Sequence, residues 1–151
     1  MKKIITPILL AWVLQSYMPV AKNPVMQKLS IDTIPVLLPA TFTDDYNIRY
    51  QVSDTLWLQK PNAYYHILRW NRAEQYLIAK NGMNNPSDQG LFTRIDYMQF
   101  KNMEPYLWGF CLTTYNAKTD SLAEFSVVKV DRLNPKKGCN GYPFSRMKRV
   151  E

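Results

Sequence analysis

The middle of the chain holds two neighbouring runs with the alternation of β-strands, Leu91–Phe100 and Tyr106–Leu112. A short break closed by Pro105 separates them. Successive side chains of a strand point to opposite faces, so Arg94 and Asp96 share one face of the first run. The second run carries one of the chain's two cysteines and a tryptophan, Trp108. These two runs predict adjacent strands at the centre of a sheet.

Four more strands are predicted before this pair. Polar turn formers separate them, and the ten residues from 81 to 90 read as the longest polar loop. The predicted strands are Tyr46–Val52, Thr55–Gln59, Tyr64–Trp70 and Gln75–Lys80.

A change of pattern follows Tyr115. Ser121 and Glu124 have the spacing of a capping box, and an apolar stripe continues to Leu133. This predicts a helix over 121–133, which Asn134 and Pro135 would end. The expected fold is mainly β, an antiparallel meander of about six strands forming a small or partial barrel. One C-terminal helix and a disulfide-tethered tail would complete it.

The length of 151 residues suits one domain. The ten Tyr and four Trp favour β structure, because aromatic side chains fit a pleated, half-buried surface. We expect a signal peptide over 1–21, an extended arm with three prolines over 22–42, and one β-rich domain over 43–151.

The N-terminus has the pattern of an export signal. Lys2 and Lys3 precede the apolar segment Ile4–Leu14, which is shorter than the roughly 20 residues of a membrane span. Cleavage after Ala21 would leave no transmembrane span and a periplasmic or extracellular protein. The alternative is an uncleaved anchor.

The two cysteines, Cys111 and Cys139, predict one disulfide in an exported protein. The closed loop would stabilise the fold by about 3 kcal/mol in the chain-entropy model. Two buried free thiols are the alternative. With a single histidine besides, the chain predicts no zinc site and no cofactor.

Several segments together resemble an uncharacterised family of small exported proteins of Gram-negative bacteria. They are YHILRWN, EQYLIAKN, LFTRIDYMQF, WGFC and GCNGYPFSRM. The resemblance covers residues 41–149 and implies a compact domain that carries a signal peptide. The expected architecture is also similar to that of lipocalins, which have a meander, a late helix and a disulfide to the C-terminal tail.

A candidate ligand site centres on Arg94 and Asp96, which share a strand face with apolar neighbours. A charged pair on such a face is tolerated only when paired or hydrogen-bonded, so it could anchor a polar group of a ligand. Trp70 and Trp108 could line the same site, together with His66. The alternatives are a structural ion pair, a wet sheet face and an ordinary aromatic core.

Other polar groups give weaker signals. His66 is the only histidine, and no nucleophile pattern accompanies it. Two of the scattered carboxylates Asp44, Asp45 and Glu104 could meet as a general acid and base. Calcium could bind at Asp44 and Asp45 or in the loop Asn81–Asp88, and the alternative is that these are plain turn residues. The chain has a net charge of +7 and a basic tail, but no nucleic-acid motif.

Three functions stay open. The preferred one is a non-catalytic exported domain that binds a small apolar or amphipathic molecule in a barrel or cupped sheet. The second is an envelope interaction or inhibitor module that uses the loop 81–90 or the basic tail. The third is a hydrolase using His66 or paired carboxylates.

Overall fold

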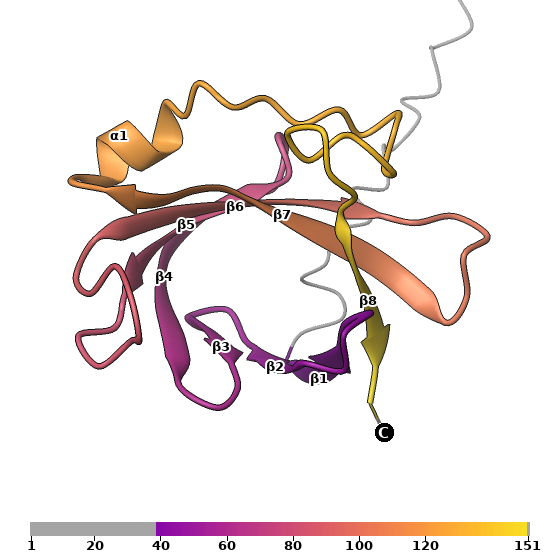
Figure 1. Cartoon of the computed structure of the whole chain (residues 1–151), viewed down its shortest axis with the longest axis horizontal. Coiled ribbons are helices and arrows are strands. Elements are labelled where there is room, and N and C mark those ends of the chain that lie inside the picture. Colours follow the sequence, from indigo (N-terminus) through magenta and orange to yellow (C-terminus); the bar gives the residue numbers. More distant parts are fainter. Residues whose placement is uncertain (1–38, 151) are drawn as a thin grey trace, which may run out of the picture.

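A computed structural model describes residues 39–150 as a closed antiparallel β-barrel of eight strands (Figure 1). Each strand pairs with the next one along the chain, and β8 pairs with β1 to close the barrel. The elements are β1 Ala40–Thr43, β2 Arg49–Val52, β3 Leu56–Gln59, β4 Ala63–Asn71, β5 Tyr76–Asn81, β6 Phe92–Gln99, β7 Tyr106–Ala117, α1 Asp120–Glu124 and β8 Ser145–Arg149.

The barrel has two strands more than the six that the sequence predicts. β1 lies in the expected arm, and β8 lies in the expected tail. Each has only four or five residues, too short to give a clear alternation. Each is a strand because it has partners on both sides. β1 pairs with β2, β8 pairs with β7, and the two pair with one another, Thr43 opposite Lys148, to close the barrel. The predicted antiparallel meander is confirmed, and the barrel is closed.

The predicted helix over 121–133 is mostly wrong. Only α1 is helical, and Thr119 rather than Ser121 caps it by accepting a hydrogen bond from the Leu122 N–H. Beyond Phe125 the chain is irregular and crosses the outside of β6 and β7 (Figure 1). Three valines between 127 and 130 disfavour the helix through their stiff side chains. We call residues 118–137 the strap.

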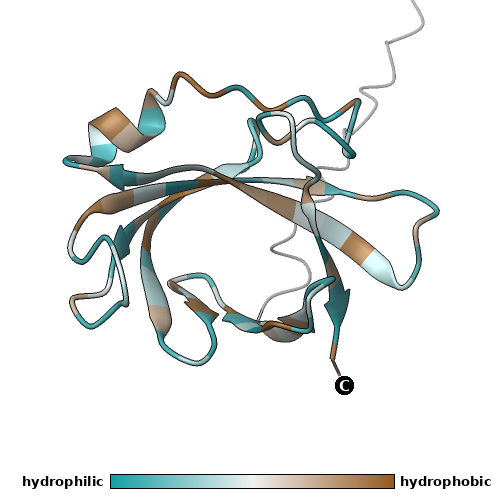
Figure 2. Ribbon diagram, in the orientation of Figure 1, coloured by the Kyte–Doolittle hydropathy of each residue, from teal (hydrophilic) through white to brown (hydrophobic). Residues whose placement is uncertain are grey.

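Apolar side chains fill the inside of the barrel, while polar residues alternate with them along the strands (Figure 2). The cluster contains residues from every strand except β4, whose partly buried Tyr65, Ile67 and Trp70 pack against it. It consists of Phe42, Tyr50, Val52, Trp57, Leu77, Ala79, Ile95, Tyr97, Trp108, Phe110 and Met147. Burial of this surface is the main stabilising contribution of the fold.

The predicted disulfide is confirmed: Cys111 on β7 is bonded to Cys139, with their Cα atoms 5.6 Å apart. It fastens the segment after the strap to the outer wall of the barrel and is compatible with an exported protein. The expected signal peptide over 1–21 and residues 22–38 of the expected arm lie outside the described residues. Between residues 39 and 150, no helix has the length and apolar character needed to cross a membrane.

Candidate ligand-binding site

Two adjacent strands place the central residues of the site inside the barrel. Tyr97 of β6 stands opposite Phe110 of β7, and Gln99 stands opposite Trp108. Residues that face each other across antiparallel strands share a face, so Tyr97, Phe110 and Trp108 point to the same side. All three belong to the interior cluster. The hairpin of β6 and β7 thus supplies one wall of an aromatic interior.

Edge-to-face aromatic contacts organise this interior. The Trp57 ring lies 4.9 Å from Phe110 and 5.6 Å from Trp108, measured between ring centroids. Phe42 of β1 lies 5.2 Å from Trp108 on the other side. Such T-shaped pairs place positive ring edges against negative faces and contribute beyond area burial. The rings hold each other in fixed orientations.

Two polar atoms in this interior have no hydrogen-bond partner among residues 39–150. They are the Tyr97 hydroxyl and the Trp108 Nε1–H group. Both residues are at most 1% exposed, so neither atom is hydrated from outside. Burial raises the pKa of Tyr97 to about 12, which keeps the hydroxyl protonated as a donor. Because buried polar groups are nearly always paired, two exceptions within one interior cluster are unusual.

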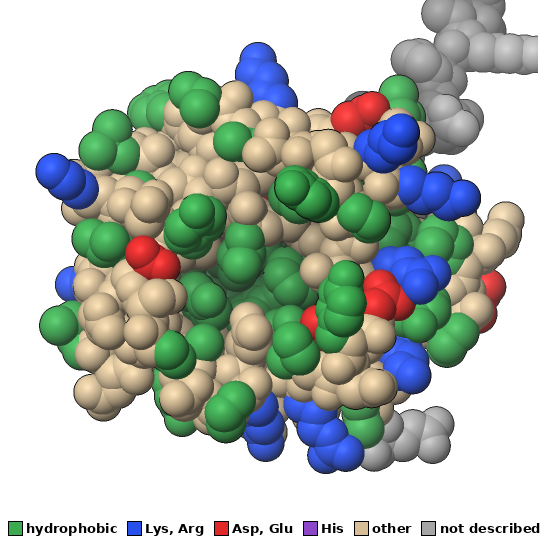
Figure 3. Space-filling view, in the orientation of Figure 1, with side chains coloured by type: hydrophobic (Ala, Val, Ile, Leu, Met, Phe, Trp, Pro, Cys, Tyr) green, Lys and Arg blue, Asp and Glu red, His purple; other side chains and the backbone are tan. Residues whose placement is uncertain are grey.

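Trp70 connects the buried interior to the solvent. This side chain lies on β4, is half-buried and packs against the interior cluster. Its ring centroid lies 5.7 Å from that of Tyr97, and its indole N–H donates to the Asp54 carbonyl at 2.8 Å. Figure 3, drawn in the orientation of Figure 1, shows apolar side chains gathered in a hollow at the centre of the view. In Figure 1 the same place looks into the barrel. The apolar interior is therefore open to one side.

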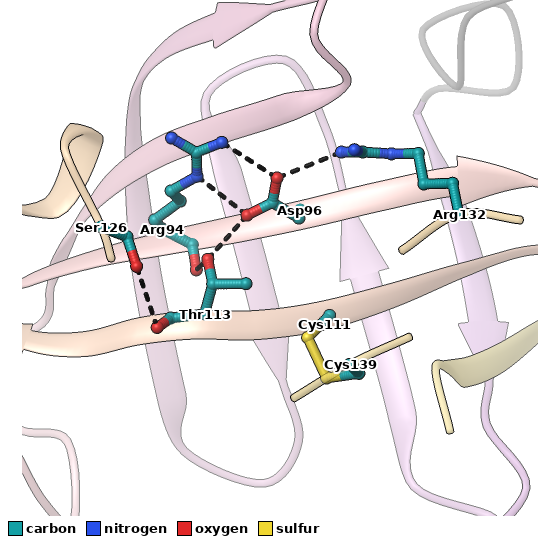
Figure 4. The surroundings of a disulfide bond; sticks show 7 residues. All are labelled: Arg94, Asp96, Cys111, Thr113, Ser126, Arg132 and Cys139. Atoms are coloured by element: carbon teal, nitrogen blue, oxygen red, sulfur yellow. Dashed lines mark hydrogen bonds and ion pairs between the residues drawn. A yellow bond between two sulfur atoms is a disulfide. The ribbon is translucent and has the colours of Figure 1, made fainter. Parts of the chain in front are cut away.

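Arg94 and Asp96 lie on the outer face of the barrel wall, opposite to the face of Tyr97 (Figure 4). The Asp96 carboxylate accepts from Arg94 Nε at 2.8 Å and from Nη2 at 3.0 Å. The Thr113 hydroxyl donates to it at 2.6 Å. Burial lowers the pKa of Arg94, but the hydrogen bond and the charge of Asp96, with smaller contributions from Tyr76 and Glu74, together raise it above its ordinary value. The pair is buried and fully paired.

The strap supplies the remaining partners of this pair. Arg132 donates to the Asp96 carboxylate at 3.1 Å and to the backbone carbonyl of Tyr97 at 2.9 Å. Arg94 also donates to the Glu124 carbonyl, and its guanidinium stacks on the Tyr76 ring. The hydrogen bonds of Arg132 and of the Glu124 carbonyl join the barrel wall to the strap, while the Tyr76 ring belongs to β5 of the wall itself. We call Arg94, Asp96, Thr113 and Arg132 the ionic clamp.

The structure brings two of the five predicted ligand-site residues together and separates the others. Trp70 and Trp108 both pack in the barrel interior. Arg94 and Asp96 lie on the outer face of the barrel wall, where they belong to the ionic clamp. His66 is exposed on β4, opposite Leu56 and Lys80 of the neighbouring strands.

The site also contains residues that the sequence did not single out as ligand contacts, above all Tyr97. The alternation along the strand predicts that Tyr97 lies on the face opposite to Arg94 and Asp96. It does not predict which of the two faces points into the barrel. Only the apolar character of Ile95 beside it favours that face as the inner one.

The carboxylates expected as acid–base or calcium candidates hold turns and ion pairs. Asp44 accepts hydrogen bonds from the backbone of Tyr46 and Ile48 and from the Tyr50 hydroxyl at 3.0 Å. Asp45 forms an ion pair with Arg146 at 2.7 Å. Burial raises the pKa of Asp45, but hydrogen bonds from Arg146 lower it further than burial raises it. Among residues 39–150, no three His, Cys, Asp or Glu side chains gather as a metal site requires.

A second apolar depression lies outside the barrel, between the loop after β6 and the tail before β8. Its volume is about 530 Å³, and Tyr142 at its edge is 73% exposed. Its apolar lining consists of Tyr46, Phe100, Met103, Pro135, Tyr142, Pro143 and Phe144. This groove is a competing place for an apolar molecule, so it supplies a control for the site inside the barrel.

Comparison with known proteins adds no relative: no family model, no curated protein and no solved structure matches the chain.

Proposed function

We propose that the protein is a non-catalytic binding domain that takes a small amphipathic molecule into the open side of its barrel. The apolar part of the molecule would lie against Trp70 and the aromatic rings behind it. An oxygen-bearing group would accept hydrogen bonds from Tyr97 and Trp108. The observation that carries the proposal is the pair of unpartnered donors in an otherwise apolar interior.

The two donors define the polarity of the ligand. An indole N–H group can only donate, and the Tyr97 hydroxyl stays protonated at any physiological pH. A carboxylate, carbonyl or hydroxyl oxygen satisfies both, whereas an ammonium group satisfies neither. A fatty acid, a fatty alcohol or a similar molecule has this combination of an apolar body and an acceptor end.

Trp70 is the side chain that would have to move. Both donor atoms are shielded from solvent, so a ligand reaches them only if a side chain between them and the hollow turns aside. Trp70 is half-buried, touches the Tyr97 ring and is held at its polar end by one backbone carbonyl. Breaking that hydrogen bond costs about 1 kcal/mol, which a bound apolar chain can offset.

The test compares dodecanoic acid and dodecanol with dodecane, by native mass spectrometry and by quenching of tryptophan fluorescence. We expect the two oxygen-bearing probes to bind, and Tyr97→Phe to weaken them about tenfold, as loss of one hydrogen bond predicts. Dodecane binding should not change in this variant. Organic extraction of the protein from its native source, followed by mass spectrometry, should recover a molecule with an apolar body and an acceptor oxygen.

Tyr142→Phe is the matched control, because it removes a tyrosine hydroxyl at the outer groove and leaves the barrel unchanged. If it weakens the probes as much as Tyr97→Phe does, the ligand occupies the groove, and the interior site is wrong. Failure of every probe to bind, with no molecule recovered by extraction, would reject the proposed function.

A further inference from the structure

The strap carries a row of exposed apolar side chains on the outside of the barrel. From Phe125 to Leu133 the odd-numbered residues are exposed and the even-numbered ones are half-buried. Phe125 is 79% exposed, Val127 93% and Leu133 98%. Lys129 and Asp131 separate Leu133 from the other two. Single exposed apolar residues need no explanation, but Phe125 and Val127 are exposed side by side, and a contiguous apolar patch indicates an interaction surface.

Neighbouring residues extend this row into a patch. Leu122 of α1 and Tyr115 of β7 are more than half exposed, and Leu112 is 36% exposed. These three residues, together with Phe125 and Val127, line one groove of about 490 Å³ between β7 and the strap. We call Tyr115, Leu122, Phe125 and Val127 the strap patch. Leu112 is not part of it, because it stands opposite Ile95 of the interior cluster and shares its face. It lies on the outer wall and is separate from the opening of the barrel.

The charges along the strap are mostly positive. Four lysines are exposed, Lys118, Lys129, Lys136 and Lys137. Two of the three carboxylates are neutralised, because Arg69 forms ion pairs with Asp120 at 2.9 Å and with Glu124 at 2.7 Å. The third, Asp131, accepts a hydrogen bond from the Leu133 N–H group. Among residues 39–150, neither these lysines nor Asp131 form an ion pair, so the strap offers an anionic partner four cations against one carboxylate.

The half-buried residues of the strap hold the patch in place. The Ser126 hydroxyl donates to the Thr113 carbonyl, and Arg132 donates to Asp96 and to the Tyr97 carbonyl. The disulfide fastens Cys139 a few residues later (Figure 4). The apolar side chains are thus already presented outwards, so binding need not order the segment.

We propose that the strap patch docks the protein onto an anionic lipid bilayer. Apolar side chains would enter the boundary between headgroups and acyl chains, and the lysines would contact anionic headgroups. This combination of an apolar row with flanking lysines is what a charged lipid surface binds. The inference is independent of the proposed ligand, because the two surfaces lie on opposite sides of the barrel wall.

Co-sedimentation with vesicles tests the proposal, using phosphatidylcholine alone or mixed with phosphatidylglycerol. We expect binding to the anionic vesicles only, with an affinity that falls as salt is added. Phe125→Ser combined with Val127→Ser should weaken binding more than tenfold, because both apolar side chains are then lost. Lys118→Gln combined with Lys129→Gln should weaken it about thirtyfold, at about 1 kcal/mol for each lysine near the surface.

The matched control is Tyr46→Ser combined with Met83→Ser, which removes two equally exposed apolar side chains elsewhere on the barrel. This variant should sediment as the unmodified protein does. Binding that the strap variants do not change would overturn the proposal. So would a dimer that dissociates into monomers in the Phe125/Val127 variant without any binding to lipid, since the occupant of the patch would then be a second copy of the chain.

Discussion

The two faces of β6 solve the problem of buried polar groups in opposite ways. On the outer face, the Asp96 carboxylate is 1% exposed and accepts hydrogen bonds from Arg94, Arg132 and Thr113. On the inner face, the Tyr97 hydroxyl is equally buried and has no partner among the described residues. A satisfied polar group contributes to the structure and is not free to bind anything else. The inner face of β6 therefore has the capacity to bind a ligand, whereas the outer face holds the strap against the barrel.

The largest effect is expected from the inner face. Trp57→Ala removes a side chain that is 1% exposed and contacts three aromatic rings. We expect a loss of about 4 kcal/mol in the free energy of unfolding, from lost burial and the cavity left behind. Urea denaturation would measure it. Trp70→Ala should cost about half as much, because Trp70 is half-buried, and equal losses would contradict this account of the interior.

The disulfide is expected to rank second. Replacing both Cys111 and Cys139 by alanine releases a loop that spans 28 residues, a loss of about 3 kcal/mol in the chain-entropy model. Denaturation of this variant, and of the unmodified protein under reducing conditions, should give the same shift. A loss below about 1 kcal/mol in both would mean that the pairing of β8 with β7 and β1 holds the tail without the disulfide.

The ionic clamp is expected to contribute less than either. Asp96→Ala leaves Arg94 and Arg132 without their shared carboxylate, and an unpaired buried charge costs about 3–5 kcal/mol. The side chains of the two arginines are 15% and 27% exposed, so water can hydrate them in part. We therefore expect a loss of about 2 kcal/mol in urea denaturation. Asp54→Ala, at an exposed carboxylate that forms no ion pair, should change stability by less than about 0.5 kcal/mol.

Tyr97→Phe gives the sharpest contrast with Asp96→Ala. It deletes a buried hydroxyl that has no partner, so the free protein should keep its stability or gain up to about 1 kcal/mol. Thermal and urea denaturation of the ligand-free protein would measure this. A loss of more than about 1 kcal/mol would show that the hydroxyl is paired in solution, and the two faces of β6 would then be alike.

The smallest effect concerns pH. Hydrogen bonds from Tyr76 and Arg69 hold the pKa of Glu124 below its ordinary value of 4.5. A carboxyl group with a lowered pKa in the folded state stabilises the fold above its unfolded pKa, and this contribution disappears as the pH falls through the folded value. The loss should therefore develop as the pH drops below about 5. Glu124→Gln should flatten this part of the stability profile, and an unchanged profile would contradict the pairing.

The predicted strands differ in how well the sequence alone reveals them. The runs around Arg94 and Trp108 alternate over many residues, so their period identifies them. β1 and β8 have too few residues for a period, and each is defined as a strand by its partners, β2 and β8 for β1, and β7 and β1 for β8. The predicted helix is too long because the apolar stripe that follows the capping box of Ser121 and Glu124 continues to Leu133, whereas α1 ends at Glu124. The segment after Phe125 instead follows the barrel wall, where hydrogen bonds of Ser126 and Arg132 hold it.

The sequence by itself determined the alternation along each long strand, the pairing of its two cysteines and the shared face of Arg94 and Asp96. These follow from local geometry or from simple counting. Only the tertiary structure decided which face of β6 points inwards, because two faces of a strand become inside and outside when the barrel closes. Closure also buried Tyr97 and Trp108 without partners and laid the strap over Asp96, since both depend on residues that lie far apart in the chain.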